Sequence, residues 1–184
     1  MRRRLRRDGG GRGVRAGRLL VVGLLLSGLL AGGAMWWLQV HAFYERLPAR
    51  DTVLLTPAGA LTPVAVAVGG YQGIDSDSSP IRHRACFQLE GGAPALTPYG
   101  DPTPLNAPRW FSCFDAAAIG AALRDGTATA VLAERDVRYG IDRVAALFDD
   151  GRGYAWTQIN ACGRAHFDGD PLPPGCPPPP NEAR

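Results

Sequence analysis

The chain has 184 residues, with 20 basic and 17 acidic side chains and a formal net charge of +3. Every basic residue is arginine, and the lack of lysine excludes Schiff-base chemistry and a phosphate-loop nucleotide site. Residues 1–18 carry a charge of +7, residues 19–40 carry none, and residues 41–184 carry −4. The sequence therefore joins a short basic tail to an acidic body, and its net charge gives no reason to expect nucleic-acid binding.

Residues 19–38 form an uncharged run of 20 residues that predicts a transmembrane helix. A helix of that length rises about 30 Å, which matches the hydrocarbon core of a bilayer. The arginines precede the run, while Trp36 and Trp37 lie at its far end, where an aromatic belt is expected. We therefore expect a cytoplasmic tail over residues 1–18 and a single span of the inner membrane over residues 19–40.

Two alternatives concern this span. Small residues at positions 31–34 would allow cleavage before Met35, which would release a secreted domain. The uncleaved anchor is favoured because the apolar run continues through two tryptophans to full spanning length. Gly28 and Gly32 have the spacing that lets two helix backbones approach closely. The span therefore packs against a partner helix through these glycines, or it contacts only the lipid bilayer.

After the span, the sequence predicts a stalk over residues 41–51 and an exported domain over residues 52–170. Runs typical of strands occur at residues 61–68, 81–89, 128–133, 141–148 and 154–160. In the second of these runs, His83 shares an apolar face with Ala85 and Phe87. An Asp-Gly turn separates the last two runs, which indicates a β-hairpin.

One helix is expected in the exported domain. Asp115 has the position of an N-cap before the alanine-rich residues 116–124. A proline- and glycine-rich loop occupies residues 90–108, and the proline-rich tail over residues 171–184 should be extended. These elements predict an α+β fold, an antiparallel sheet with one short helix, in a periplasmic domain of about 120 residues that is large enough to fold alone.

All four cysteines, Cys86, Cys113, Cys162 and Cys176, follow the span. An even number of cysteines in an oxidising compartment predicts two disulfides. Of the three possible connectivities, Cys86–Cys113 with Cys162–Cys176 is favoured because it closes the shortest loops. The second bond would tie the proline-rich tail to the end of the hairpin, and each bond would stabilise the fold by roughly 2–4 kcal/mol.

Metal binding is the alternative use of these residues. His83, Cys86, Cys162 and His166 offer two imidazoles and two sulfurs, a set suited to zinc or copper. No cysteine pair has the two-residue spacing of a zinc knuckle or of a thioredoxin-like redox site. Disulfides explain the cysteines better, and we expect no bound cofactor.

Four other residues are candidates for packing or interaction. Asp142 and Arg143 can form a charge pair in the hairpin, or ordinary cross-strand ion pairs worth under about 1 kcal/mol. Trp110 and Trp156 lie near cysteines in the sequence, where large aromatics usually pack in a core, although an exposed aromatic patch for a partner is the other interpretation. No glycine-flanked nucleophile turn accompanies the serines near His83, so no catalytic residue is assigned.

Six short segments resemble an uncharacterised family of membrane-anchored proteins from Rhodobacter-like alphaproteobacteria. They read IDSDSSP, RACF, WFSCFDA, YGIDR, WTQINACG and GCPP, and they begin at residues 74, 84, 110, 139, 156 and 175. The resemblance extends over nearly all of the chain from the span onward. It implies an inner-membrane protein, and it transfers no catalytic residue because the family is a domain of unknown function.

We therefore expect a non-enzymatic, single-pass inner-membrane protein with a cytoplasmic N-terminus and a disulfide-stabilised periplasmic domain. This domain would bind or assist another membrane or envelope protein, and no nucleic acid. The alternative is a periplasmic metal-binding protein or small enzyme that uses His83, His166 and the cysteines.

Overall fold

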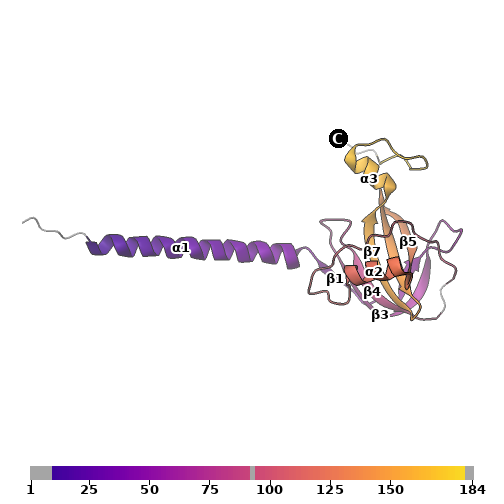
Figure 1. Cartoon of the computed structure of the whole chain (residues 1–184), viewed down its shortest axis with the longest axis horizontal. Helices are drawn as coiled ribbons and strands as arrows, with labels where there is room; N and C mark the ends of the chain where they lie inside the picture. Colours follow the sequence, from indigo (N-terminus) through magenta and orange to yellow (C-terminus); the bar gives the residue numbers. More distant parts are fainter. Residues whose placement is uncertain (1–9, 92–93, 181–184) are drawn as a thin grey trace, which may run out of the picture. The chain divides into compact units, whose positions relative to one another are not determined.

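The structure is a computed structural model that describes residues 10–91 and 94–180 (Figure 1). The chain divides into two compact units between Phe43 and Tyr44.

The first unit is the helix α1 (Gly10–Trp37), which continues into a π-helical turn, η1 (Leu38–Ala42). Among the described residues, one helix segment, Ala16–Trp37, is long and apolar enough to cross a membrane. The apolar helix predicted at residues 19–40 is therefore present, although a signal sequence near the N-terminus would meet the same criteria.

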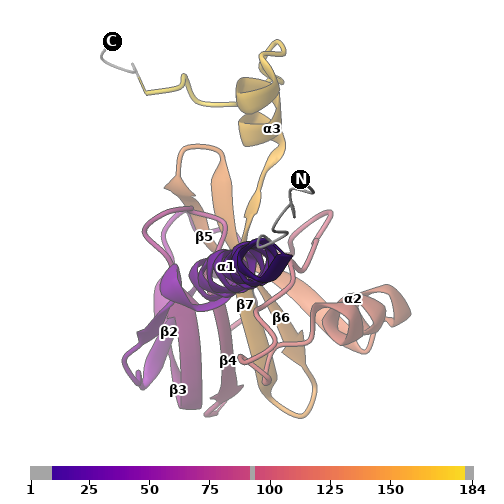
Figure 2. The same ribbon diagram turned by 90° about the vertical axis from the view of Figure 1, so that its left-hand side faces the viewer.

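The second unit is an antiparallel sheet with two short helices, which confirms the predicted α+β class. The strands follow the order β1-β3-β4-β7-β6-β5, and β2 pairs with the other half of β3. Their bounds are β1 Glu45–Leu47, β2 Thr52–Leu55, β3 Val64–Asp75, β4 Arg84–Leu89, β5 Ala128–Arg138, β6 Ile141–Phe148 and β7 Arg152–Ile159. The helices are α2 (Ala116–Asp125) and α3 (Ala161–Asp168), and α3 projects from the end of β7 away from α2 (Figure 2).

The two ends of the sheet are joined through the loop that precedes α2. The Thr97 N–H donates to the carbonyl of Thr56 at the end of β2, at 2.9 Å, while the Leu132 N–H of β5 donates to the Thr97 carbonyl, also at 2.9 Å. The Thr56 N–H in turn donates to the carbonyl of Leu132 at 3.0 Å. The sheet therefore curls into a nearly closed barrel, which removes much of its exposed edge.

The sheet is buried on both faces. One core fills the barrel interior and includes Leu55, Val68 and Phe87, while the other lies between the outer face and α2 and includes Trp156 and Ile119. The expected alternation in residues 81–89 is thus present, but the opposite face is also buried, since Arg84 and Cys86 are covered too.

Bulges in β3 and β5 change which side chains face the interior. In β3 the register shifts between Gly69 and Gln72, and Gly70 has a φ of +61°. Val66 and Val68 face the interior before this bulge, whereas Tyr71 faces it afterwards. The bulge therefore changes the residues of β3 that face the barrel interior from those with even numbers to those with odd numbers.

Five elements differ from the sequence prediction. The strand β2 was not predicted, and β5 extends five residues beyond the predicted end at residue 133. Residues 45–47, expected in a stalk, form β1 and pair with the end of β3. β3 extends seven residues beyond Val68, the predicted end of its strand. The helix α3 was not predicted, although Asn160 caps it by accepting the Gly163 N–H at 2.9 Å, and Gly169 ends it in the left-handed conformation.

Both predicted disulfides are confirmed. Cys86 on β4 is bonded to Cys113 in the loop before α2, and Cys162 on α3 is bonded to Cys176 in the proline-rich tail. The Tyr139 hydroxyl also donates to the carbonyl of Pro177, at 2.9 Å, so the tail is held to the barrel by a hydrogen bond as well as by α3.

Two glycines bring the turn between β5 and β6 against α3. A Cβ on Gly163 would lie 2.1 Å from the Gly140 carbonyl oxygen, and a Cβ on Gly140 would lie 2.3 Å from Gly163 Cα. Both contacts are with backbone atoms, which cannot move aside as a flexible side chain can. Only glycine fits at Gly163, and α3 depends on this close approach.

We expect Gly163→Ala to lower the free energy of unfolding by about 1–3 kcal/mol, the usual cost of overpacking a fixed backbone contact. Chemical denaturation of the full chain with its disulfides intact measures this change. Gly120→Ala is the matched control, because Gly120 also lies in a helix and its added Cβ would meet only the Arg124 side chain, at 3.5 Å. Equal stabilities for the two variants would contradict the close approach.

Candidate functional site

Five polar side chains form a row across the interior face of the sheet at one end of the barrel. The register pairs Arg143 of β6 with both Thr157 of β7 and Glu134 of β5. Arg84 at the start of β4 pairs with Trp156 of β7 and with Ile74 of β3. When both pairings are extended by one residue, His83 lies opposite Thr157 and Asp75. Directly opposed residues in antiparallel strands point to the same face, so we call Asp75, His83, Thr157, Arg143 and Glu134 the polar row.

The next row toward the barrel centre consists of small residues. Gly73, Ala85, Ala155 and Ala145 are paired in succession across β3, β4, β7 and β6. Ala85 and Ala155 of this row line a cavity of about 400 Å³ at this end of the barrel, whereas the side chain of Tyr71 covers Gly73. The lining of this cavity includes Tyr71, His83 and Arg143, together with the chain from the exposed Ala49 to the buried Leu55. We call it the mouth cavity.

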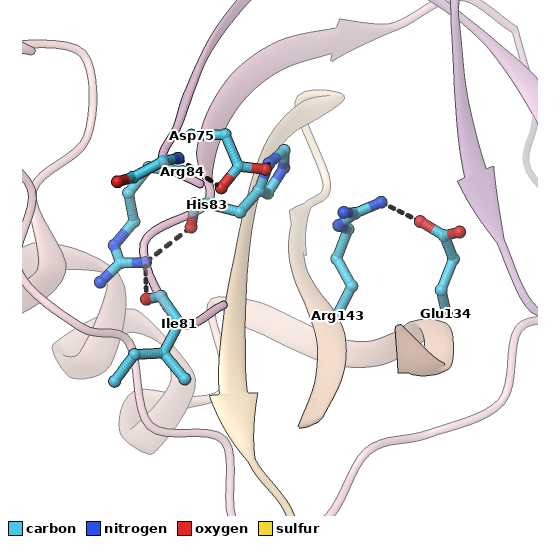
Figure 3. Close-up of polar contacts among 7 residues, drawn as sticks. Asp75, Ile81, His83, Arg84, Glu134 and Arg143 are labelled. Atoms are coloured by element: carbon cyan, nitrogen blue, oxygen red, sulfur yellow. Dashed lines mark hydrogen bonds and ion pairs between the residues drawn. The ribbon is translucent and has the colours of Figure 1, made fainter. Parts of the chain in front are cut away.

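His83 is almost completely buried, and its Nδ1 lies 3.3 Å from Asp75 Oδ2 (Figure 3). Burial lowers the pKa of His83, and the hydrogen bond to Asp75 opposes this effect without cancelling it. Burial alone would raise the pKa of Asp75, but hydrogen bonds from His83 and from the Ser76 N–H outweigh it, so the pKa is lowered. A neutral imidazole thus donates through Nδ1 to an ionised carboxylate and keeps Nε2 as an acceptor.

Arg143 and Glu134 form an ion pair on the other side of the polar row (Figure 3). Both side chains are partly shielded, with exposed fractions of 25% and 21%. Among the described residues, Arg143 Nε and the Thr157 hydroxyl are buried without a hydrogen-bond partner. The polar row therefore has unused hydrogen-bonding capacity on two adjacent strands, which is unusual for buried polar groups.

The buried guanidinium of Arg84 holds His83 in this position. It donates to the carbonyls of Ile81 and His83 at 2.9 and 2.6 Å (Figure 3). It also donates to the carbonyls of Leu105 and Asn106, at 2.7 and 3.2 Å. Burial lowers the pKa of Arg84 to about 10, so it remains charged at neutral pH. These bonds fix the turn before β4 against the loop before α2.

Asp142 and Arg143 do not pair with one another, because adjacent residues in β6 face opposite sides of the sheet. Asp142 is buried on the outer face, where it accepts from the Asp136 N–H at 2.9 Å, Asn160 Nδ2 at 3.0 Å and the Tyr99 hydroxyl at 3.1 Å. Burial and then the charge of Asp142 raise the pKa of Tyr99. This network stabilises the turn between β5 and β6.

The two candidate tryptophans have different surroundings. Trp156 is fully buried in the outer core, where its Nε1 donates to Gln158 Oε1 at 2.9 Å. Trp110 is partly exposed, and the guanidinium of Arg46 lies 5.1 Å from the centroid of its ring. Neither ring lines the mouth cavity.

The proposed set of metal ligands is not available. All four cysteine sulfurs are in disulfide bonds, His83 is paired with Asp75, and His166 packs edge-to-face on Tyr139. In the ranges that the structure describes, no three His, Cys, Asp or Glu residues are grouped so that they could hold a metal ion. In α1, Gly28 and Gly32 have open space around them, and a partner helix there stays a prediction.

Sequence pattern alone did not single out Tyr71, Glu134 or Thr157 for this site. Their shared position follows from strand register and from the bulges, which place Tyr71 and Glu134 on the interior face. His83 and Arg143 were singled out, but for metal binding and for pairing with Asp142.

Comparison with protein-family models shows that the chain belongs to a family of unknown function, DUF6446, whose model matches residues 53–177. The match includes β2 to β7, both disulfides and the whole polar row. Searches of the curated proteins and of the solved structures return no significant match. The predicted resemblance to a family of unknown function is thereby confirmed, while its membrane anchorage and its taxonomic range stay predictions.

The lowered pKa of His83 predicts a pH-dependent stability. Below the ordinary pKa of 6.5, the unfolded chain binds a proton at this residue that the folded chain does not. The free energy of unfolding should therefore fall as the pH decreases from about 7.5 to about 5.5, while the contribution of Asp75 is lost only at more acidic pH.

Urea denaturation of the full chain across this pH range measures the effect. His83→Gln should flatten the pH dependence, because glutamine can donate to Asp75 but does not titrate. His166→Gln is the control and should retain the wild-type slope. A His83→Gln slope equal to that of the wild type would contradict the neutral, buried state of His83.

Proposed function

We propose that this member of DUF6446 is a single-pass inner-membrane protein whose disulfide-bonded periplasmic domain binds a small ligand in the mouth cavity. The observation that carries the binding role is the mouth cavity itself, where polar side chains with unused hydrogen-bonding capacity border an apolar interior. Protein sites for small ligands typically have this composition, and the mouths of β-barrels are among their usual places.

The distribution of charge and cysteine supports the location. Eight arginines precede the uncharged run that begins at residue 19, and positive residues flanking a span generally stay in the cytoplasm. Both disulfides lie in the domain after the helix, and such bonds persist in oxidising compartments such as the periplasm. An uncleaved helix would keep this domain at the membrane surface.

The volume of the cavity and the contacts of the side chains around it support a binding role over catalysis. A volume of about 400 Å³ lies within the range of small-molecule sites. His83 and Asp75 form a pair that can accept a proton, but the hydroxyl opposite His83, that of Thr157, has no hydrogen-bond partner among the described residues. A nucleophile aligned with a base would require that bond.

Reporter fusions test the location. Alkaline phosphatase, which is active only outside the cytoplasm, should be active when fused after residue 180, and a green fluorescent protein fused there should not fluoresce. The intact mass of the membrane-extracted chain should include the arginine-rich tail. A mass that begins near Met35 would contradict the anchor and support secretion.

Native mass spectrometry of the full chain extracted from its own membranes tests ligand binding. We expect a small-molecule adduct on the wild type and its loss in Ala155→Leu, because Ala155 lines the mouth cavity and leucine adds three carbons to it. Ala117→Leu, which adds the same atoms to an exposed position on α2, should keep the adduct. An adduct retained by Ala155→Leu would contradict the proposed place of binding.

A further inference from the structure

We infer that the ligand of the mouth cavity is a small amphipathic anion, an organic molecule with a short apolar chain and a carboxylate or phosphate head. This inference rests on the proposed function and specifies its ligand. It follows from the charge and the free donor of Arg143 and from the apolar surface of the cavity.

Two guanidinium groups at the cavity have donors without a partner among the described residues. Arg143 bonds to Glu134, yet its Nε–H has no partner among the described residues. Arg50 lies over the ring of Tyr71, 5.7 Å from its centroid, and makes no ion pair with any described residue. Arginine presents its donors in a planar fork that matches the two oxygens of a carboxylate or phosphate.

The carboxylates near the cavity are mostly engaged. Glu134 accepts from Arg143, and Asp75 accepts from His83 and from the Ser76 N–H at 2.8 Å. Asp51 also lines the cavity, but it is exposed at the rim, where water screens its charge. Arg50 is exposed at the rim as well, so the buried part of the site is set by Arg143 and His83. His83 Nε2 is an acceptor there, but the positive charge of Arg143 acts on His83, and a cation bound at Nε2 would be repelled by it. The charge and the free Nε–H of Arg143 therefore favour an incoming acceptor group over an incoming cation.

An apolar surface continues from these donors into the barrel. Ala85, Ala133 and Ala155 line it, with Leu55 and Phe87 beside them. If each non-hydrogen atom takes about 30 Å³, as a water molecule does in the liquid, the cavity of about 400 Å³ holds on the order of ten to fifteen such atoms. A charged head at Arg143 and a chain of about six carbons fit this volume together.

The test uses the full chain in nanodiscs of neutral lipid, because detergents are themselves amphiphiles and would compete. Four probes share one chain and differ in the head: hexanoate, hexyl phosphate, hexylamine and hexanol. Isothermal titration, corrected with empty nanodiscs, should show hexanoate or hexyl phosphate binding about tenfold or more tightly than hexanol, as expected for a hydrogen-bonded ion pair. Hexylamine should bind no better than hexanol, and the ratio of the two anions distinguishes the head groups.

Variants assign the preference to Arg143. Arg143→Gln should reduce anion affinity to about that of hexanol, a loss of about tenfold or more. The double variant Arg143→Gln/Glu134→Gln leaves no unpaired carboxylate and should show the same loss, which excludes repulsion by Glu134 as its cause. Hexanol should bind both variants as it binds the wild type, which excludes misfolding. Arg138→Gln, at an exposed arginine of β5 outside the cavity, is the matched control and should bind like the wild type.

The outcomes separate this inference from the proposed function. Equal binding of hexanol and the anions, or tighter binding of hexylamine, would overturn the anionic ligand but leave a ligand-binding cavity. Unchanged anion affinity in both Arg143 variants would overturn the role of Arg143 and with it the inference. If none of the probes binds at millimolar concentration, the anionic ligand is overturned, and the adduct in native mass spectrometry still decides the binding role.

Discussion

The buried guanidinium of Arg84 is the interaction on which the candidate site depends. It satisfies four carbonyl oxygens from two separate stretches of chain, the turn before β4 and the loop before α2. A charge in this environment is stable only while all of these bonds exist, so the two stretches are fixed together. His83 is the residue before Arg84, and its place opposite Asp75 and Thr157 follows from that constraint.

The alternation of side chains in strands then gives each segment two roles. Arg84, Asp142 and Trp156 face the outer core, where they bond to fixed backbone or side-chain partners. Their neighbours His83, Arg143 and Thr157 face the barrel interior and form the polar row. Structural and candidate ligand-binding residues therefore alternate along the same strands, and a shift of one residue in register would exchange them.

Much of the fold could be predicted from local sequence. The helix α2 was predictable because Asp115 accepts two backbone N–H groups at its start, and the β6–β7 hairpin because an Asp-Gly turn separates two apolar runs. Both disulfides followed from loop length. β1 was missed because three residues, two of them charged, form a strand here only by pairing with the end of β3.

The candidate site could not be predicted in the same way, because it is defined by register across five strands. Tyr71 and Glu134 reach the interior only because of bulges, and a bulge depends on how a strand pairs with its neighbours. The cavity itself borders Ala85 and Ala155, paired residues that are unremarkable in either strand alone. The interior is unfilled at one end, next to charged groups that a filled core would exclude. Such an arrangement lowers packing in the barrel, and the binding of a ligand there would recover the lost contacts.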